Sequence, residues 1–261
     1  MVLGGFQKLT LIDYPGKLAA TVFTSGCSFC CPWCYSPELV LPERIKKHPK
    51  IKEKQIIDFL EKRKGMLEGV VVCGGEPTIN KDLPEFIKKI KKMGFLVKLD
   101  TNGSNPEMLK ELIKEKLVDY IAMDIKAPLG AKNQNAKIKN RTFINESEGK
   151  KEDGVLFASQ NYERAAGVKV DLGNIKKSVE IIKNSGVDYE FRTTVVPGIH
   201  SKEDILEITK LIKGAKRYFL QTFRPEKTID PKFEKIKPYP SEFLLEIQKA
   251  IAPFFEICQA R

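Results

Sequence analysis

Four cysteines fall within the short segment GCSFCCPWCY, residues 26–35. Cysteine thiolates are common ligands of zinc and of iron–sulfur clusters, and neighbours this close make poor disulfide partners. The spacing of the cysteines allows two alternative sets of metal ligands. Cys27 with Cys30 and Cys31 with Cys34 form two C-x2-C pairs, which suit a closed four-cysteine site. Cys27, Cys31 and Cys34 alone form C-x3-C-x2-C, which leaves a cube-shaped iron–sulfur cluster one protein ligand short and one iron open to a small molecule.

Three further polar clusters follow strand-like runs of the chain. They read CGGEP at 73–77, DTNG at 100–103 and DIK at 124–126. Glycines allow close backbone approach, carboxylates attract cations and a lysine attracts anions. Such a mixture suits a small zwitterionic ligand, provided that the clusters meet in space.

Apolar runs with strand character alternate with stretches of helical periodicity. The expected strands are 18–25, 69–73, 95–100, 119–124, 189–196 and 217–223, and the expected helices are about 52–64, 82–93, 106–117, 173–185, 202–213 and 241–252. Six strand–helix units predict a parallel α/β sheet. In strand–helix barrels the carboxyl ends of the strands gather at one mouth, so the polar clusters should converge there.

The chain of 261 residues predicts a single domain, 1–261. Its 129–161 segment, after the fourth strand, is rich in polar residues and is expected to be a long loop or disordered insertion. No apolar run is long enough for a membrane span, and the N-terminus lacks a signal pattern, so a cytoplasmic location is expected. The net charge of +11 comes mainly from lysines on helix faces, which makes a nucleic-acid partner unlikely on composition alone.

The cysteine triad, with Trp33 before its last member, resembles the signature of the radical S-adenosylmethionine (SAM) superfamily, whose fold is a partial six-unit (β/α)6 TIM-like barrel. The resemblance implies a 4Fe-4S cluster held by Cys27, Cys31 and Cys34. It also implies that the open iron chelates SAM, and that an electron from the cluster cleaves SAM to a 5′-deoxyadenosyl radical. Cys30 is then a bystander.

The other motifs resemble those of glycyl-radical enzyme activating enzymes, and most closely those that activate anaerobic ribonucleotide reductases. The resemblance implies that GGEP and the DTNG aspartate lie at the methionine ammonium and that the DIK lysine binds its carboxylate. It also implies that a monovalent cation can bind Asp100, Thr101 and Asp124, and that the adenine lies near Trp33 and the backbone of Tyr35. The expected cofactor-binding residues are Trp33, Tyr35, Gly74, Gly75, Glu76, Pro77, Asp100, Thr101, Asn102, Asp124, Lys126 and Arg192. Of these, Asp124 and Lys126 are the expected catalytic residues.

The resemblance implies a glycyl-radical enzyme as the protein substrate and a flavodoxin-like or ferredoxin-like electron donor. Two departures, DYPGK at 13–17 and CYS at 34–36, differ from common activating-enzyme patterns. One alternative keeps the radical chemistry but takes RNA or a small metabolite as substrate. A distant alternative is a zinc-binding nucleic-acid module that uses all four clustered cysteines.

Several residues near the motifs have less certain roles. His200 follows VVPGI and is expected to be a surface or helix-capping histidine. Cys73 is expected to be a small buried residue rather than a ligand. Gln221 lies near the end of the last predicted strand and Arg224 directly after it, and neither receives an assigned role.

Overall fold

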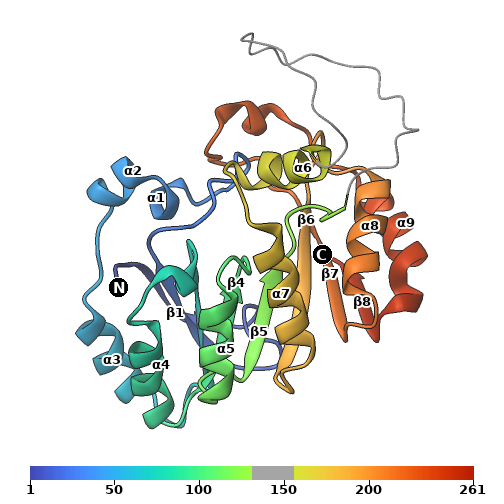
Figure 1. The fold of residues 1–261 in the computed structure, drawn as a ribbon. Helices are drawn as coiled ribbons and strands as arrows, with labels where there is room; N and C mark the ends of the chain where they lie inside the picture. The colour runs from blue at the N-terminus through green and yellow to red at the C-terminus, as the bar shows by residue number, and fades with distance from the viewer. Residues whose placement is uncertain (131–155) are drawn as a thin grey trace.

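The computed structural model describes residues 1–130 and 156–261. Its eight strands form one sheet whose spatial order follows the chain, from β1 to β8 (Figure 1). β1 pairs with β2 in antiparallel fashion, and each later neighbouring pair is parallel. The strands are β1 (Leu3–Thr10), β2 (Ala19–Thr24), β3 (Gly69–Gly74), β4 (Leu96–Thr101), β5 (Tyr120–Asp124), β6 (Asp188–Val195), β7 (Arg217–Thr222) and β8 (Ile257–Ala260).

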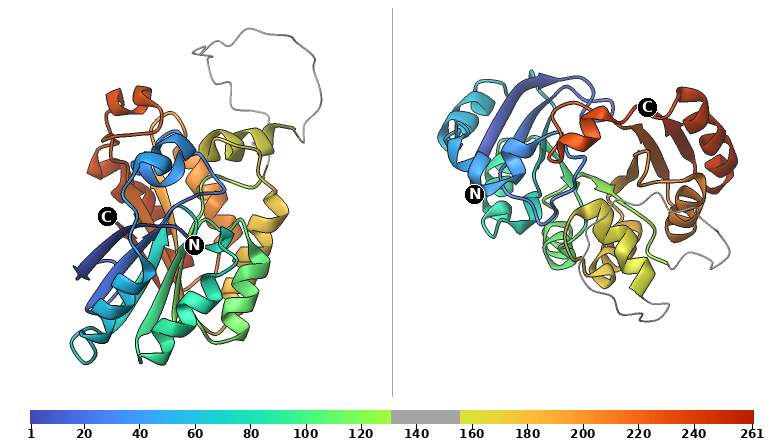
Figure 2. Two further views of the ribbon diagram at one scale, coloured as in Figure 1. Left: turned by 90° about the vertical axis from the view of Figure 1, so that its left-hand side faces the viewer. Right: turned by 90° about the horizontal axis from the view of Figure 1, so that it is seen from above.

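Helices connect the parallel strands and cover one side of the sheet. Seen from above in Figure 2, the sheet curves into an arc with the helices outside it. The helices are α1 (Pro37–Val40), α2 (Pro42–Lys47), α3 (Glu53–Glu61), α4 (Leu83–Lys92), α5 (Pro106–Lys114), α6 (Leu156–Ala166), α7 (Leu172–Lys183), α8 (Lys202–Ile212) and α9 (Ser241–Ile251), with 3-10 turns η1 (Pro77–Ile79), η2 (Pro231–Lys235) and η3 (Ala252–Phe254).

The central residues of the inner strands, β2 to β7, are largely buried on both faces of the sheet, and β3 is an example. Val70 and Val72 belong to the large core between the sheet and the helices, whereas Val71 belongs to a second, smaller core on the inner face with Tyr14 and Tyr120. Because successive strand residues point to opposite faces, a continuous apolar run is what such a two-sided strand requires. The sheet is therefore a packed barrel wall with a mouth at its carboxyl end.

The predicted α/β fold with a partial barrel is confirmed, and β2 to β7 correspond to the six predicted strands. Four glycines follow helices of the barrel: Gly94 and Gly214 come directly after the C-caps of α4 and α8, and Gly65 and Gly186 lie further beyond the ends of α3 and α7. All four have positive φ, from 73° to 89°, a conformation that costs other residues more than glycine: Gly65, Gly94, Gly186 and Gly214.

Two strands and three helices escaped prediction: β1 and β8, the short helices α1 and α2, and α6. β1 is an edge strand with paired glycines, and β8 has only four residues, so neither carries a clear alternating pattern. The expectation of a loop over 129–161 was wrong from Leu156 onward, where α6 begins. The spacing of its buried Tyr162, Ala165 and Ala166 is helical, but a long polar stretch precedes it. Residues 131–155 of the predicted insertion lie outside the described part.

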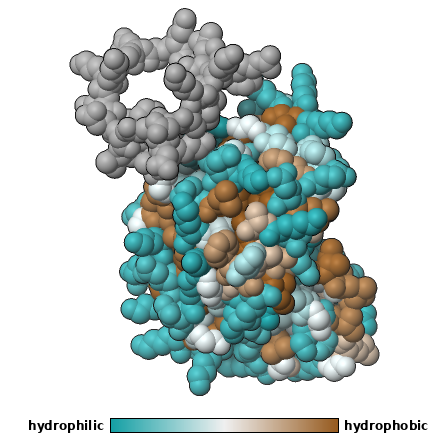
Figure 3. Space-filling view, turned by 90° about the vertical axis from the view of Figure 1, so that its right-hand side faces the viewer, coloured by the Kyte–Doolittle hydropathy of each residue, from teal (hydrophilic) through white to brown (hydrophobic). Residues whose placement is uncertain are grey.

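Charged side chains cover the outer faces of the helices. Lysines pair with acidic neighbours along one helix, as in Lys54 with Asp58 and Lys88 with Glu85. Figure 3, which views the side that carries α8 and α9, shows hydrophilic residues over much of that face, with apolar residues in separate patches. In the described ranges, no helix has the length and apolar character that crossing a bilayer requires.

Candidate active site at the mouth of the barrel

The cysteine loop leaves the end of β2 and is anchored there by the glycines of GGEP. The Gly75 amide donates to the Thr24 carbonyl at 2.9 Å, and the Glu76 amide donates to the Gly26 carbonyl at 2.8 Å. A Cβ at Gly75 would lie 2.0 Å from the Gly26 carbonyl oxygen, so any other residue would push the two loops apart. The glycines are thus needed for close approach of the third strand's end to the cysteine loop.

The side chain of Glu76, in the GGEP motif, connects this motif to DTNG through hydrogen bonds. Its carboxylate is fully buried and accepts hydrogen bonds from the Thr78 amide at 3.1 Å, the Thr101 hydroxyl at 2.8 Å and the Asn102 amide at 2.6 Å. The Thr78 hydroxyl donates to it as well. Burial raises the pKa of the Glu76 carboxyl, and these donors offset only part of that effect. The carboxylate therefore fixes two motif loops together.

Replacing Glu76 by glutamine should loosen this junction. Each carboxylate oxygen accepts from a backbone amide, so either orientation of a glutamine amide would set its NH2 group against an N–H donor. We expect Glu76→Gln to lower the free energy of unfolding by about 1–3 kcal/mol in urea titrations. Glu85→Gln, at an exposed helix pair, is the matched control and should change little. Equal stability of Glu76→Gln and wild type would contradict this role.

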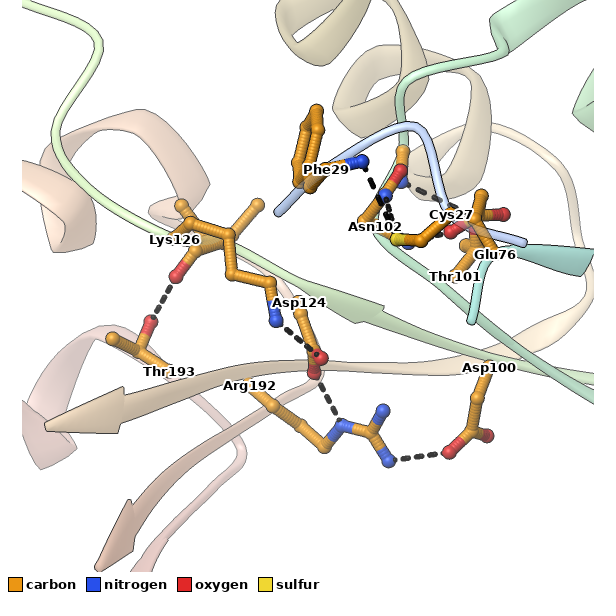
Figure 4. Close-up of polar contacts among 12 residues, drawn as sticks. Cys27, Phe29, Glu76, Asp100, Thr101, Asn102, Asp124, Lys126, Arg192 and Thr193 are labelled. Atoms are coloured by element: carbon orange, nitrogen blue, oxygen red, sulfur yellow. Dashed lines mark hydrogen bonds and ion pairs between the residues drawn. The ribbon is translucent and has the colours of Figure 1, made fainter. Parts of the chain in front are cut away.

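The three cysteines of the C-x3-C-x2-C set lie in the loop that these contacts hold. The Cys27 sulfur accepts from the Phe29 amide at 3.3 Å and lies 3.8 Å from Asn102 Nδ2 (Figure 4). Burial raises the pKa of the Cys27 and Cys31 thiols to about 12, and raises the pKa of Cys34 in the same direction. The thiols are therefore protonated without a metal, and metal binding must release those protons.

Across the mouth, five charged side chains from β4, β5 and β6 form a continuous chain of ion pairs. Arg192 donates through Nε to Asp124 and through a terminal nitrogen to Asp100, both at 2.8 Å (Figure 4). Lys126 Nζ lies 2.9 Å from the second Asp124 oxygen, and Lys98 pairs with Asp100. The attraction between these alternating positive and negative side chains holds the ends of β4, β5 and β6 in a fixed arrangement.

Burial and charge act against each other at these carboxylates. Burial alone would raise the pKa of Asp100 and Asp124, but the charges of Arg192 and the two lysines outweigh it and hold both pKa values below the ordinary range. Burial likewise disfavours the Lys126 ammonium, yet the Asp124 charge raises its pKa above the usual value. Asp100, Asp124 and Lys126 are therefore ionised at neutral pH.

Lys126 also faces the cysteine loop. Its Nζ lies 5.0 Å from the centre of the Trp33 ring, within cation–π range. The Trp33 side chain is buried, and its indole N–H has no hydrogen-bond partner among the described residues. A buried donor without a partner is uncommon and marks a place where a ligand could supply an acceptor.

Other residues singled out in the sequence lie at varied depths around the mouth. Tyr35 is 61% exposed, and Pro77 is the buried first residue of η1. Gln221 is half-buried at the end of β7, and Arg224 is exposed beyond it. The expectation of a buried position for Cys73 was only partly met, because it is half-buried at the end of β3.

One residue outside the predicted motifs, His200, is held differently from expectation, and Cys30 makes a backbone contact that the sequence did not predict. The prediction of a surface position for His200 was wrong, since only 2% of it is exposed. Both ring nitrogens are bonded, to the Val196 amide at 3.0 Å and the Lys126 carbonyl at 2.8 Å. Cys30 donates its backbone amide to the Ala166 carbonyl at 2.8 Å, at the end of α6.

Sequence reasoning overlooked two charged residues inside strands. Lys98 precedes Asp100 by two positions, and Glu190 precedes Arg192 by two. Alternate residues of a strand share a face, so the period of two could have placed both on the site's side. Glu190 is almost fully buried and accepts from the Tyr120 hydroxyl at 2.8 Å, below the ion-pair chain.

Comparisons with known proteins agree with this architecture. A family model described as the radical SAM superfamily matches residues 21–212. A protein of Methanocaldococcus jannaschii named "Putative glycyl-radical enzyme activating enzyme" is 34% identical over 92% of this chain and 87% of its own length. A 7-carboxy-7-deazaguanine synthase of Thermococcus kodakarensis is 27% identical over 42% of this chain and 50% of its own length.

A solved structure shares the fold. Streptococcus suis SuiB, in its structure with the precursor peptide SuiA, matches with a TM-score of 0.62 at 12% identity over 92% of this chain. The match spans about half of SuiB, 47% of that chain, so the likeness concerns the fold alone. With the family match over most of the chain and a relative matching nearly end to end, the chain belongs to the radical SAM superfamily and is a radical SAM enzyme.

Proposed function

We propose that the protein activates a glycyl-radical enzyme by removing a hydrogen atom from one glycine of that partner. The observation that carries this proposal is the Methanocaldococcus relative, which aligns with 92% of the chain and whose name states that role. The motifs DTNG and DIK support it, because their charged groups meet at one mouth. An anaerobic ribonucleotide reductase is the partner that the sequence resemblance favours.

The residues present fit a 4Fe-4S cluster and SAM. Cys27, Cys31 and Cys34 supply three thiols from one anchored loop, which is the donor type that such clusters take. Among the described residues, no three metal-ligating side chains gather closely enough to hold a single metal ion. A cluster binds each cysteine to a different iron, so its ligands need not converge on one point. The zinc module gains no support from this geometry.

Each side chain at the mouth has a role under this proposal. When bound, the cluster and SAM supply a 5′-deoxyadenosyl radical able to take a hydrogen atom from an unactivated C–H bond. The Lys126 ammonium would hold the carboxylate of the methionine moiety, and Asp100 would face its ammonium. Arg192 would keep Asp100 and Asp124 in place, and the Trp33 indole N–H would find an acceptor on the ligand.

The remaining expectations stay part of the proposal. The Asp124 and Thr101 oxygens would accept a monovalent cation, Asn102 and the GGEP backbone would line the cofactor, and Tyr35 would lie beside the adenine. A flavodoxin-like or ferredoxin-like protein would deliver the electron in the cytoplasm. Because the Tyr35 side chain is 61% exposed, an incoming protein loop would be able to contact it.

A second candidate keeps the chemistry and changes the substrate to a small metabolite. It is favoured by the partial match to the Thermococcus relative, whose name states a small-molecule product. Fold similarity does not decide between these substrates, since substrate choice depends on the loops around the mouth.

The test is the release of 5′-deoxyadenosine by the reconstituted enzyme with dithionite and SAM. Under the proposal, anaerobic ribonucleotide reductase from the same organism raises product formation well above the uncoupled level, and Lys126→Met reduces it in both conditions. Stimulation by small nucleotide metabolites, but not by the reductase, would support the second candidate instead. No product from a fully loaded cluster would contradict both.

A further inference from the structure

His200 occupies a buried position between the turn after β6 and the end of β5. The Val196 amide donates to its Nδ1 at 3.0 Å, so that nitrogen carries no proton. The other nitrogen, Nε2, therefore carries the proton and donates to the Lys126 carbonyl at 2.8 Å. The ring thus connects its own turn to the residue that carries the DIK lysine.

The backbone of Lys126 is fixed on both sides. Its amide donates to the Tyr162 hydroxyl at 3.4 Å, and its carbonyl accepts from His200. The preceding peptide is also held, because the Thr193 hydroxyl donates to the Ile125 carbonyl at 3.0 Å. Of these contacts, the His200 bond is the shortest, and it acts directly on the peptide from which the lysine side chain extends.

The ring is suited to a fixed role rather than to proton transfer. Burial lowers the pKa of His200 to about 4, so the neutral form predominates at neutral pH. The charged groups near it are Lys126, Arg164 and Asp204. The Tyr239 hydroxyl donates to the His200 carbonyl at 2.9 Å, which secures the residue from its other side.

We infer that His200 is a positioning residue, which sets the Lys126 ammonium between Asp124 and the Trp33 ring through its hydrogen bond to the Lys126 carbonyl. The inference rests on the proposed role of Lys126 in holding the carboxylate of SAM. It concerns affinity for SAM rather than the chemical step, because His200 contacts the Lys126 carbonyl and not its ammonium.

Two substitutions separate this role from a local structural one. Gln Nε2 can occupy the place of His Nε2, so His200→Gln keeps a donor for the Lys126 carbonyl and loses the acceptor for Val196. Asn Oδ1 can occupy the place of Nδ1, so His200→Asn keeps that acceptor and loses the donor. If His200 positions Lys126, His200→Asn should weaken SAM binding more than His200→Gln. If His200 only stabilises its own turn, His200→Gln should weaken SAM binding more than His200→Asn.

The experiment measures the dissociation constant for SAM by equilibrium dialysis, on protein with a reconstituted cluster and no reductant. We expect His200→Asn to bind about tenfold more weakly and His200→Gln to stay within about threefold of wild type, the scale of one hydrogen bond. In a Lys126→Met background, His200→Asn should add no further loss. Iron content and thermal midpoints are measured for each variant.

Each other outcome overturns a defined part of the account. A greater loss for glutamine than for asparagine, or an undiminished asparagine effect in the Lys126→Met background, would overturn the positioning role. Unchanged SAM affinity of Lys126→Met itself would overturn the lysine's role in the proposed function. If His200→Asn does not bind a cluster, Tyr162→Phe is used in its place. It removes the hydroxyl that accepts from the Lys126 amide, and it should weaken SAM binding only when Lys126 is present.

Discussion

The Cys31→Ser variant is expected to retain almost no iron after anaerobic reconstitution, whereas Cys30→Ser is expected to retain the wild-type iron content. Cys31 is buried in the loop that GGEP anchors, and serine oxygen is a poor replacement for a thiolate at an iron–sulfur cluster. Cys30 is held through its backbone amide by the Ala166 carbonyl, a contact that serine preserves. Iron and sulfide analysis with the visible absorption spectrum measures both variants.

The adjacent positions make Cys30→Ser a matched control for the same chemical change. Cys27→Ser and Cys34→Ser should behave as Cys31→Ser does, because each would remove one of three protein ligands. Loss of the cluster in all four variants would instead indicate that four cysteines bind the metal. That result would leave no iron open to SAM and would contradict the proposed ligand set.

Arg192→Met is expected to lower the free energy of unfolding by about 3–5 kcal/mol, the usual effect of removing one partner from a buried ion pair. Arg192 contacts Asp100 and Asp124 at 2.8 Å, and its loss leaves each carboxylate with a single lysine. Urea unfolding of the protein without its cluster is the measurement. Lys177→Met, at an exposed pair with Glu107, is the control and should leave stability unchanged.

The same variant has a predictable dependence on pH. In the folded protein the pKa values of Asp100 and Asp124 are lower than their unfolded value of about 3.9. Their contribution to stability is therefore complete above that pH and is lost as the pH falls through the folded values. The advantage of wild type over Arg192→Met should be largest near neutrality and should shrink on acidification. An advantage that grows in acid would contradict the ion-pair account.

The convergence of the motifs was predictable because it follows from parallel strands. CGGEP, DTNG and DIK each end a strand, and strands that run in one direction bring their ends together. Lys98 and Glu190 could also have been found, since each lies two positions before a predicted site residue on the same strand. The two-residue period of a strand and the alternation of strands with helices can both be recognised within short segments of the sequence, so these features were predictable.

Long-range partners could not be predicted in the same way. Glu76 meets Thr101 and Asn102, and the His200 ring meets Lys126, only after the barrel has formed. From sequence alone a histidine in a turn is expected to be exposed, because neither the amide that donates to its ring nor the carbonyl that accepts from it can be identified. These contacts depend on how the ends of different strands approach each other in space. A residue pattern within one segment does not specify that approach.

The most direct test of the central claim is electron paramagnetic resonance of a partner glycyl-radical enzyme after anaerobic incubation with this protein, SAM and dithionite. The account predicts a glycyl radical on the partner whose signal narrows when the partner contains α-deuterated glycine, with 5′-deoxyadenosine formed alongside it. Cys31→Ser should give neither. Release of 5′-deoxyadenosine without a radical on any anaerobic ribonucleotide reductase offered, together with turnover of a small metabolite, would contradict it.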